Sequence, residues 1–276
     1  MLFDRRVAVE IGRPGFPGRR IEGLRIDFDI TKTRTRTADT GKVSIWNPSK
    51  DTIALARTEG SFVRLFAGYG FASLIYTGKP VKNGIKESRN GGGDGEDPTD
   101  NVLSFELKDS VRELTEERVD LKFDGSVSYG SVLNDVIDAF SVPRGTITAT
   151  FPAVRLPAGH RETGTISDIL DRLANIAGAD WFITDGAVNF IPSETGDVGL
   201  PAIEVSARNK NLIGSPTETE NGVEVKMLLQ QNIIPGSVFQ LESDRITGAF
   251  AVSTAQYKGD SGFAQDFYTI ATGRVR

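Results

Sequence analysis

Four acidic residues in one glycine-rich stretch are the first candidates for chemistry in this chain. Asp94, Glu96, Asp97 and Asp100 fall within KNGIKESRNGGGDGEDPTDN, residues 82–101. Carboxylate oxygens are ligands that calcium accepts, so a calcium site is one interpretation. The spacing does not match the D-x-[DN]-x-[DN]-G loop, however, and the stretch lacks apolar periodicity. We therefore expect a flexible loop between two strands, with no metal and no other cofactor.

Cysteine and histidine chemistry is almost absent. The chain has no cysteine, which excludes disulfides, thiolate metal sites and thiol nucleophiles. Its one histidine, His160, lies in the polar segment RLPAGHRETG. A lone histidine in such a segment is typical of a surface residue rather than a general base or a metal ligand.

Motifs of phosphate binding and nucleophilic catalysis are also missing. Neither G-x-x-x-x-G-K-[ST] nor G-x-S-x-G occurs. Paired carboxylates for sugar hydrolysis stay open, because 37 Asp and Glu residues are available and their spacing in the fold is unknown. Trp46 and Trp181 are expected to pack in or beside the core, with stacking on sugars as the alternative. We therefore expect that this chain is not an enzyme.

Composition describes a soluble folded protein. Of the 276 residues, 38% are hydrophobic and 25% charged, and the formal net charge is −5. Broad nucleic-acid binding is not expected, because it needs an excess of Lys and Arg. No apolar run of eighteen residues is present, so no membrane insertion is expected. The N-terminus lacks the apolar core of a signal peptide, which predicts synthesis in the cytoplasm.

The stretch from Gly41 to Tyr69 predicts strand, helix and strand. Val43 and Ile45 alternate with polar residues, as in a half-buried strand. Asn-Pro at 47 and 48 then breaks the strand, and Ser49 can cap a helix over Ser49–Glu59 that Gly60 ends. A second alternating run follows over residues 63–69.

The strongest strand signal precedes that stretch. Leu24, Ile26, Phe28 and Ile30 alternate strictly with Arg25, Asp27, Asp29 and Thr31. The polar segment TKTRTRTADTG, residues 31–41, follows and predicts the exposed end of a long hairpin. Its basic residues Lys32, Arg34 and Arg36 are typical of a solvated loop, with a docking contact as the alternative.

The middle of the chain predicts a small α/β unit. Apolar residues at helical spacing occur over 128–143 and 163–177, the second run having Thr165 and Asp168 at capping-box spacing and Gly178 as a terminator. Asp185-Gly186 between two apolar runs predicts a hairpin. Strand patterns return over the last seventy-five residues. We therefore predict domains 1–108, 109–200 and 201–276.

An internal similarity links the two β-rich ends. The segment GKVSIWNPSKDTIALARTEGSFVRLFAG, residues 41–68, contains in order a strand, a break with a proline, Gly-Ser, and a second strand rich in Phe, Val and Leu. NGVEVKMLLQQNIIPGSVFQLES, residues 221–243, repeats this order with a shorter middle. The pattern favours a structural repeat.

The order of these segments resembles the baseplate hub proteins of contractile-tailed phages, the late control protein D group and the hubs of Mu-like phages. The residues that carry the resemblance are RIDFDITKT with the 41–69 stretch, TISDILDRLANIAGADWFITDGAVNFIP, and GVEVKMLLQQNIIPGSVFQLES with ITGAFAVSTAQYKGD. The resemblance implies a mainly β fold, in which two tail-tube-like antiparallel β-barrels flank a small α/β domain. It also implies a homotrimer whose six barrels form a ring in the virion.

Such a hub would join the hexameric tail tube to the trimeric central spike, contact other baseplate proteins, and line a channel through which DNA passes without stable binding. Under this interpretation Asp27 and Asp29 are candidates to face the channel, where negative charge would repel phosphates. Candidates for the subunit or tube interface are Lys32, Arg34, Arg36, Asp51, Ile53 and Leu55. The alternatives are a tail-associated cell-wall hydrolase or carbohydrate-binding component, and another ring-forming tube or tail-tip protein.

Overall fold

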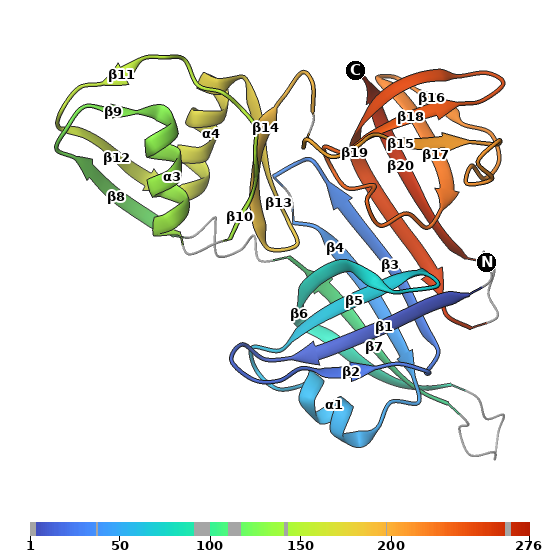
Figure 1. Ribbon diagram of the computed structural model, residues 1–276. Helices are drawn as coiled ribbons and strands as arrows, with labels where there is room; N and C mark the ends of the chain where they lie inside the picture. Colours follow the sequence, from blue (N-terminus) through green and yellow to red (C-terminus); the bar gives the residue numbers. More distant parts are fainter. Residues whose placement is uncertain are drawn as a thin grey trace.

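Strands from both ends of the chain form one hydrogen-bonded network in the computed structural model, which describes residues 4–36, 38–90, 100–109, 117–140, 143–196, 198–262 and 266–276. The strands of the first β unit are β1 (Arg5–Gly12), β2 (Arg19–Ile21), β3 (Ile26–Thr33), β4 (Thr40–Trp46), β5 (Phe62–Tyr69), β6 (Ser73–Asn90) and β7 (Asp100–Lys108). Those of the second β unit are β15 (Ile203–Ser206), β16 (Thr217–Thr219), β17 (Gly222–Leu228), β18 (Val238–Glu242), β19 (Thr247–Asp260) and β20 (Phe267–Val275). Figure 1 shows the two units joined through β3 and β19.

The predicted alternation is present in the strands that carry it. Along β3, buried and partly exposed residues alternate without interruption from Ile26 to Thr33. In β4, Val43 and Ile45 are fully buried while Lys42 is exposed. The apolar sides of these strands therefore form the core, as the period of two requires.

Helix α1 (Lys50–Ala56) is shorter than predicted. Its start is as expected, since the Ser49 side chain accepts a hydrogen bond from the Thr52 backbone N–H at 3.2 Å. The helix ends at Ala56 rather than Glu59. The hydroxyl of Ser61 donates to the Ala56 carbonyl at 2.8 Å. This side chain, which follows Gly60, therefore satisfies a carbonyl that the last turn of the helix leaves free.

The two β units repeat one strand order. The first contains the path β3-β4-β7-β6-β5-β1, and the second the path β16-β17-β20-β19-β18-β15. Reading each path along the chain gives the same correspondence throughout, in which β4 matches β17, β7 matches β20 and β6 matches β19. The predicted repeat is thus present as a repeat of topology. The units differ at one end, where β15 pairs parallel to β18 while β1 pairs antiparallel to β5.

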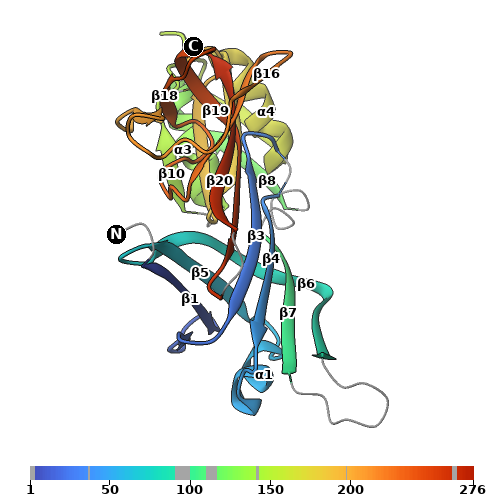
Figure 2. The ribbon, with the colours of Figure 1, turned by 90° about the vertical axis from the view of Figure 1, so that its right-hand side faces the viewer.

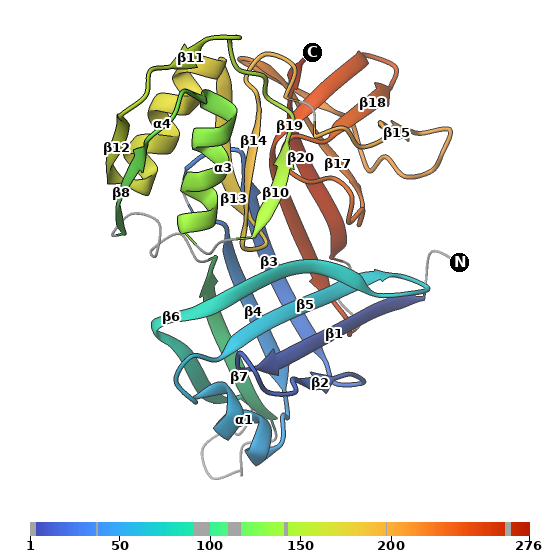
Figure 3. The same ribbon diagram turned by 60° about the vertical axis from the view of Figure 1, so that its left-hand side comes forward.

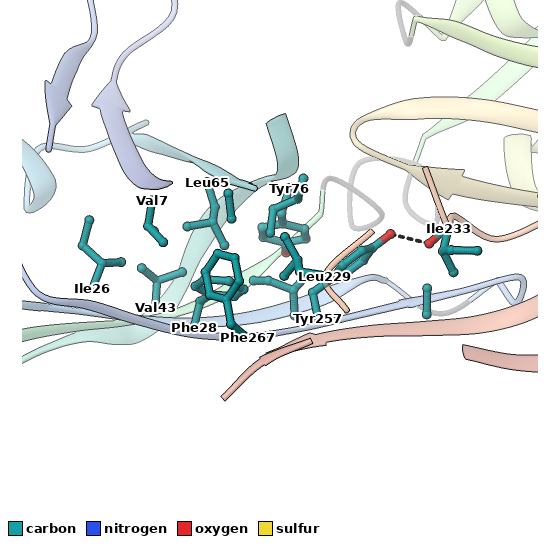
Figure 4. Packing of buried hydrophobic residues seen from close by; sticks show 14 of the residues in the cluster. Val7, Ile26, Phe28, Val43, Leu65, Tyr76, Leu229, Ile233, Tyr257 and Phe267 are labelled. Atoms are coloured by element: carbon teal, nitrogen blue, oxygen red, sulfur yellow. Dashed lines mark hydrogen bonds between the residues drawn. The ribbon is translucent and has the colours of Figure 1, made fainter. Parts of the chain in front are cut away.

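A continuous apolar core extends through both units. Phe28 of β3 meets Phe267 of β20 edge to face, with ring centroids 6.2 Å apart, and Tyr69 packs on the same ring at 5.1 Å. Figure 4 shows Phe28 and Phe267 together with Tyr257, whose hydroxyl donates to the Ile233 carbonyl. Because both units supply this cluster, neither buries its apolar face alone.

The middle segment forms an α/β unit with its own core. Its elements are β8 (Arg118–Phe123), β9 (Val127–Ser128), α3 (Tyr129–Ala139), β10 (Arg144–Ile147), β11 (Arg155–Leu156), β12 (His160–Thr165), α4 (Ile166–Ala177), β13 (Ala179–Thr184) and β14 (Ala187–Pro192). Figure 3 shows α3 and α4 beside the β13-β14 hairpin, and residues of both helices share a buried cluster with that hairpin.

Local sequence signals correctly predict both ends of α4 and the hairpin turn of the α/β unit. Thr165 caps α4, and Gly178 ends it in the left-handed region at φ 58°. Asp185 and Gly186 have φ values of 52° and 79°, as a two-residue hairpin turn requires. The fold is therefore mainly β with an α/β insertion, as predicted, while the domain boundaries at 108 and 200 stay predictions. Among the described residues, no helix is long and apolar enough to cross a membrane.

Candidate functional site

The end of the β3-β4 hairpin contacts the α/β unit, and this differs from the exposed loop that the sequence predicts. The side chain of Lys32 is 1% exposed, and its Nζ lies 2.5 Å from Asp185 Oδ2 in the turn between β13 and β14. Figure 2 shows the hairpin rising alongside the upper part of the molecule. The cause lies in the alternation of β3, which continues past Ile30 and turns Lys32 toward the buried side.

Arg34 completes the same contact. Its Nη2 lies 2.9 Å from Asp180 Oδ2 and donates to the backbone carbonyls of Pro192 and Ser193, both at 2.9 Å. Burial lowers the pKa of the Arg34 guanidinium, whereas the nearby Asp180 carboxylate raises it. The buried cation thus keeps a compensating carboxylate, whose side chain is 35% exposed, as a charge in a protein interior requires.

A buried carboxyl lies between the two contacting elements. Asp39 is 0% exposed and accepts hydrogen bonds from the Thr33 backbone N–H at 2.9 Å and from the Thr184 hydroxyl at 2.8 Å. Burial raises the pKa of Asp39 to about 7, although both hydrogen bonds and Lys32 act in the opposite direction. Asp109 adds a further contact by accepting from the Gly186 backbone N–H at 2.9 Å.

We name Lys32, Arg34, Asp39, Asp180 and Asp185 the charged junction. Sequence reasoning identified its two cations but not its three carboxyls. Asp185 was recognised only as a turn residue, and nothing in the sequence around Asp39 distinguishes it from a solvated residue. Arg36, the third predicted cation, makes a more exposed ion pair with Asp171 at 2.8 Å. A contact of these cations with another subunit stays a prediction, since their charges are here paired within one chain.

The opposite face of β3 carries the predicted channel residues. Asp29 is partly exposed and pairs with Lys258 of β19 at 3.2 Å, and it also accepts from Gln256 at 2.8 Å. Asp27 lies opposite Asp260 in the same pair of strands. Burial, and then the charge of Asp260, raises the pKa of Asp27. Strand pairing therefore places acidic side chains from both β units on one face.

That face is not uniformly acidic. Lys42 is directly opposite Asp29 on β4, and Glu106 is opposite Lys42 on β7. Lys86 of β6 pairs with Glu106 at 2.7 Å. Charges of both signs thus alternate across the sheet. A general repulsion of phosphates, as expected from Asp27 and Asp29 alone, would be moderated by these lysines.

The predicted interface residues of α1 differ in exposure. Asp51 is exposed and lies 3.8 Å from Arg19. Ile53, in contrast, is 8% exposed and belongs to the core of its own chain, and Leu55 packs against that core with part of its surface exposed. Asp51 and Leu55 are the two that a neighbouring molecule could reach. Their role in an interface stays a prediction.

The remaining candidates do not form a catalytic or metal site within the described part of the chain. Asp94, Glu96 and Asp97 lie outside the described residues, and Asp100 accepts a hydrogen bond from Asn47 at 2.8 Å. Among residues that the structure describes, no group of three potential ligands is close enough to hold a metal ion.

The histidine and the tryptophans have structural partners. His160 is in a strand rather than in a surface loop, and its Nε2 lies 2.8 Å from Glu162 Oε1. Trp181 is 4% exposed and donates from Nε1 to Asp171 at 2.6 Å. Trp46 is half-buried beneath the Arg25 guanidinium, 4.5 Å from the ring centroid. Trp181 packs in the core of the α/β unit, as predicted, whereas Trp46 lies on the face of β4 that is opposite to Val43 and Ile45.

Comparison with solved structures identifies the fold. Over 97% of its length the chain superimposes on 96% of a tail protein from Neisseria meningitidis, with a TM-score of 0.61 and 12% identity. It also matches the 43 kDa tail protein of prophage MuSo2 from Shewanella oneidensis, with a TM-score of 0.59 and 11% identity, covering 99% and 98% of the two chains.

A third match is to an E. coli component of the type VI secretion system, which is described as structurally similar to the T4 tail proteins gp27 and gp5. Its TM-score is 0.57 and its identity 9%, with 96% of this chain and 76% of the other covered. Comparisons with protein families and with curated proteins give no match. The chain therefore has the fold of phage tail proteins, which agrees with the resemblance that its sequence shows.

Proposed function

We propose that this chain is a structural protein of a phage tail baseplate, namely its hub. Three copies form a ring of six β units that joins the hexameric tail tube to the trimeric central spike. The proposal includes contacts with other baseplate proteins, a place in the virion after synthesis in the host cytoplasm, and no enzymatic activity. The fold shared with tail proteins supports the tail assignment, and the internal repeat supports the copy number.

The observation that carries the proposal is the joint between the two β units. Because both units have the same strand order, β3·β19 pairing places two equivalent units side by side in one sheet. A chain of this kind occupies two positions of a six-membered ring, so three chains complete it. Such a ring has three-fold symmetry, because it contains three identical chains. Its six β units have similar backbones and are therefore related by near six-fold symmetry. This matches a trimeric spike on one side and a hexameric tube on the other.

The polar face of the shared sheet is the proposed wall of the channel. Its alternating charges favour passage of DNA over binding, because no continuous row of cations is available to replace phosphate counterions. Asp27 and Asp29 contribute the negative charges from β3. Replacing both with Lys should slow DNA ejection while leaving assembly intact, whereas Glu59→Lys on an exposed turn should change neither. Unchanged ejection in the double variant would place this face away from the channel.

Another ring-forming tail protein is the alternative that the fold leaves open. Six copies per ring, rather than three, would identify it. A cell-wall hydrolase or carbohydrate-binding component would instead need two accessible carboxyls in a cleft, roughly 5–10 Å apart. Asp39, whose pKa is raised to about 7, is fully buried and has its hydrogen bonds within the chain.

Mass measurement of the purified chain by light scattering and native mass spectrometry tests the proposal. We expect three copies per particle. A stable hexamer would favour the tube or tail-tip alternative, and a monomer at all concentrations would overturn the trimer. Incubation with peptidoglycan should show neither turnover nor binding.

A further inference from the structure

Several strand edges in the shared sheet lack a partner within the described residues, among them those of β2 and β15, and two others lie on β6 and β16. Residues 85–89 of β6 pair with β7 on one side, and no strand lies on their other side. Strand β16 pairs with β17 only. Along β16-β17-β20-β19-β3-β4-β7-β6 these are the outermost edges, because β5, which continues the path, pairs only with residues 73–78 of β6. An open strand edge is a template for pairing with another strand.

The internal repeat indicates what each edge would accept. In the correspondence of the two units, β6 matches β19 and β16 matches β3. The chain already joins β19 to β3, antiparallel, within itself. The edge that is free on β6 is thus equivalent to the edge of β19 that binds β3, and the free edge of β16 is equivalent to the edge of β3 that binds β19.

From this equivalence we infer that β6 of one copy pairs antiparallel with β16 of the next copy. The inference rests on the proposed trimer and names the strands that join its subunits. The resulting interface is heterologous, since two different edges meet. It closes after three copies only if each intermolecular joint repeats the rotation of the joint within the chain.

The equivalence also sets the register. Strands β4 and β17 share a burial pattern over their last six residues, which aligns Trp46 with Leu228 and Lys42 with Glu224. Following the pairs from Trp46 through Val102 to Ser88, and from Leu228 through Tyr268 to Lys258, makes Ser88 equivalent to Lys258. By the same procedure Thr217, opposite Glu224, is equivalent to Asp29, opposite Lys42. Lys258 faces Asp29 within the chain, so Ser88 should face Thr217 of the next copy.

Charges on the two edges are complementary in part. Lys82, Lys86 and Arg89 on β6 are exposed, and so are Glu218 and Glu220 in and beside β16. In the predicted register Arg89 lies diagonally across from Glu218 on the same face, within reach of its long side chain. Glu87 lies directly opposite Glu218 in this register, and its charge is already paired with Arg57 at 2.8 Å. The joint within the chain carries an ion pair at the positions equivalent to Ser88 and Thr217, between Lys258 and Asp29 at 3.2 Å. Lysines can also protect an edge from pairing, and the experiment below separates these roles.

Disulfide formation tests the strand pair directly, because the chain contains no other cysteine. The variant Ser88→Cys/Thr217→Cys should form, on mild oxidation, covalent dimers and trimers on a non-reducing gel and nothing larger. Mixing the two single variants should give only cross-linked dimers. The matched control is Ser88→Cys/Thr219→Cys, which shifts one cysteine by two residues on the same face. Diagonal neighbours are about 7–8 Å apart, beyond the reach of an unstrained disulfide, so the control should cross-link at least tenfold more slowly.

Charge reversal gives a second measurement that does not depend on cysteines. Arg89→Glu should weaken trimer association about three- to tenfold, as loss of a surface ion pair predicts, and adding Glu218→Arg should restore it. Trimers that form without the Ser88–Thr217 cross-link, and whose association does not change with the charge reversals, would overturn the edge pairing but not the trimer. Equal cross-linking in the shifted control would overturn the register. A chain that stays monomeric overturns the proposed trimer as well.

Discussion

Strand β3 makes two joints of opposite chemistry. Its first half pairs with β19 and buries Phe28 against Phe267, so a regular ladder and an apolar core connect the two β units. Its far end places Lys32 and Arg34 on carboxylates of the α/β unit. A ladder with an apolar core can be repeated by any equivalent strand, whereas buried cations that need particular carboxylates fit one partner only. The first joint suits a repeating ring, and the second holds the insertion in a fixed orientation.

The largest expected effect comes from the apolar joint. Phe28 is 1% exposed, so Phe28→Ala should remove about 3–5 kcal/mol from the free energy of unfolding through lost burial and a residual cavity. Urea denaturation measures this loss. Phe71→Ala, at a side chain that is 66% exposed, is the control and should change stability by less than about 0.5 kcal/mol. If Phe28→Ala lowered the free energy of unfolding by less than about 1 kcal/mol, as a surface substitution does, this contact would not hold the units together.

The charged junction should show the next largest effect. Asp185→Asn keeps a residue type that tolerates the positive φ of 52° but leaves the buried Lys32 ammonium without its nearest carboxylate. We expect a loss of about 3 kcal/mol in the free energy of unfolding, since an uncompensated buried charge is costly. Hydrogen exchange should rise in β13 and β14 more than in β18. Equal stability of the variant and the parent would show that Lys32 has another sufficient partner.

Asp39 should make stability depend on pH in a direction opposite to that of a salt-bridged carboxylate. Its pKa is about 7 in the folded protein and near 4 in an unfolded chain. The folded state therefore binds the proton more tightly, so the contribution of this group to stability falls as pH rises from about 4 to about 7 and is constant above. Asp39→Asn can keep both hydrogen bonds and should gain about 2 kcal/mol relative to the parent between pH 5 and pH 8. An unchanged difference between these pH values would contradict a raised pKa.

The smallest effect is expected at the exposed end of the junction. Arg36 and Asp171 form an ion pair whose side chains are 57% and 30% exposed. Arg36→Ala should cost less than about 1 kcal/mol, because exposed ion pairs contribute little and are screened by salt. Thermal unfolding at low and high salt measures this cost. A loss as large as that of Asp185→Asn would erase the distinction between the buried and the exposed parts of this joint.

Sequence patterns predicted the local structure where a residue type has one dominant physical effect. Thr165 and Gly178 bound α4 because a side-chain cap and a left-handed glycine are local requirements. Asp185-Gly186 predicted its hairpin for the same reason. Alternation in β3 predicted a buried side, and the order of segments predicted a fold that the comparisons confirm.

Contacts between distant parts of the chain could not be predicted in this way. Lys32 and Arg34 were expected in solvent because of their charge, although the period of β3 already placed them on the buried side. Their carboxylate partners are about 150 residues away in sequence, as Lys32 and Asp185 show with a separation of 153. The end of α1 was misplaced because Ser61, beyond the helix, supplies the hydrogen bond that stops it at Ala56.

Single-particle reconstruction of the assembled tail end tests the central claim most directly. The account predicts three copies of this chain in one ring, with β units related by near six-fold symmetry and β6 of each copy beside β16 of the next. A ring of six copies, or a chain lying outside the axial ring, would contradict it.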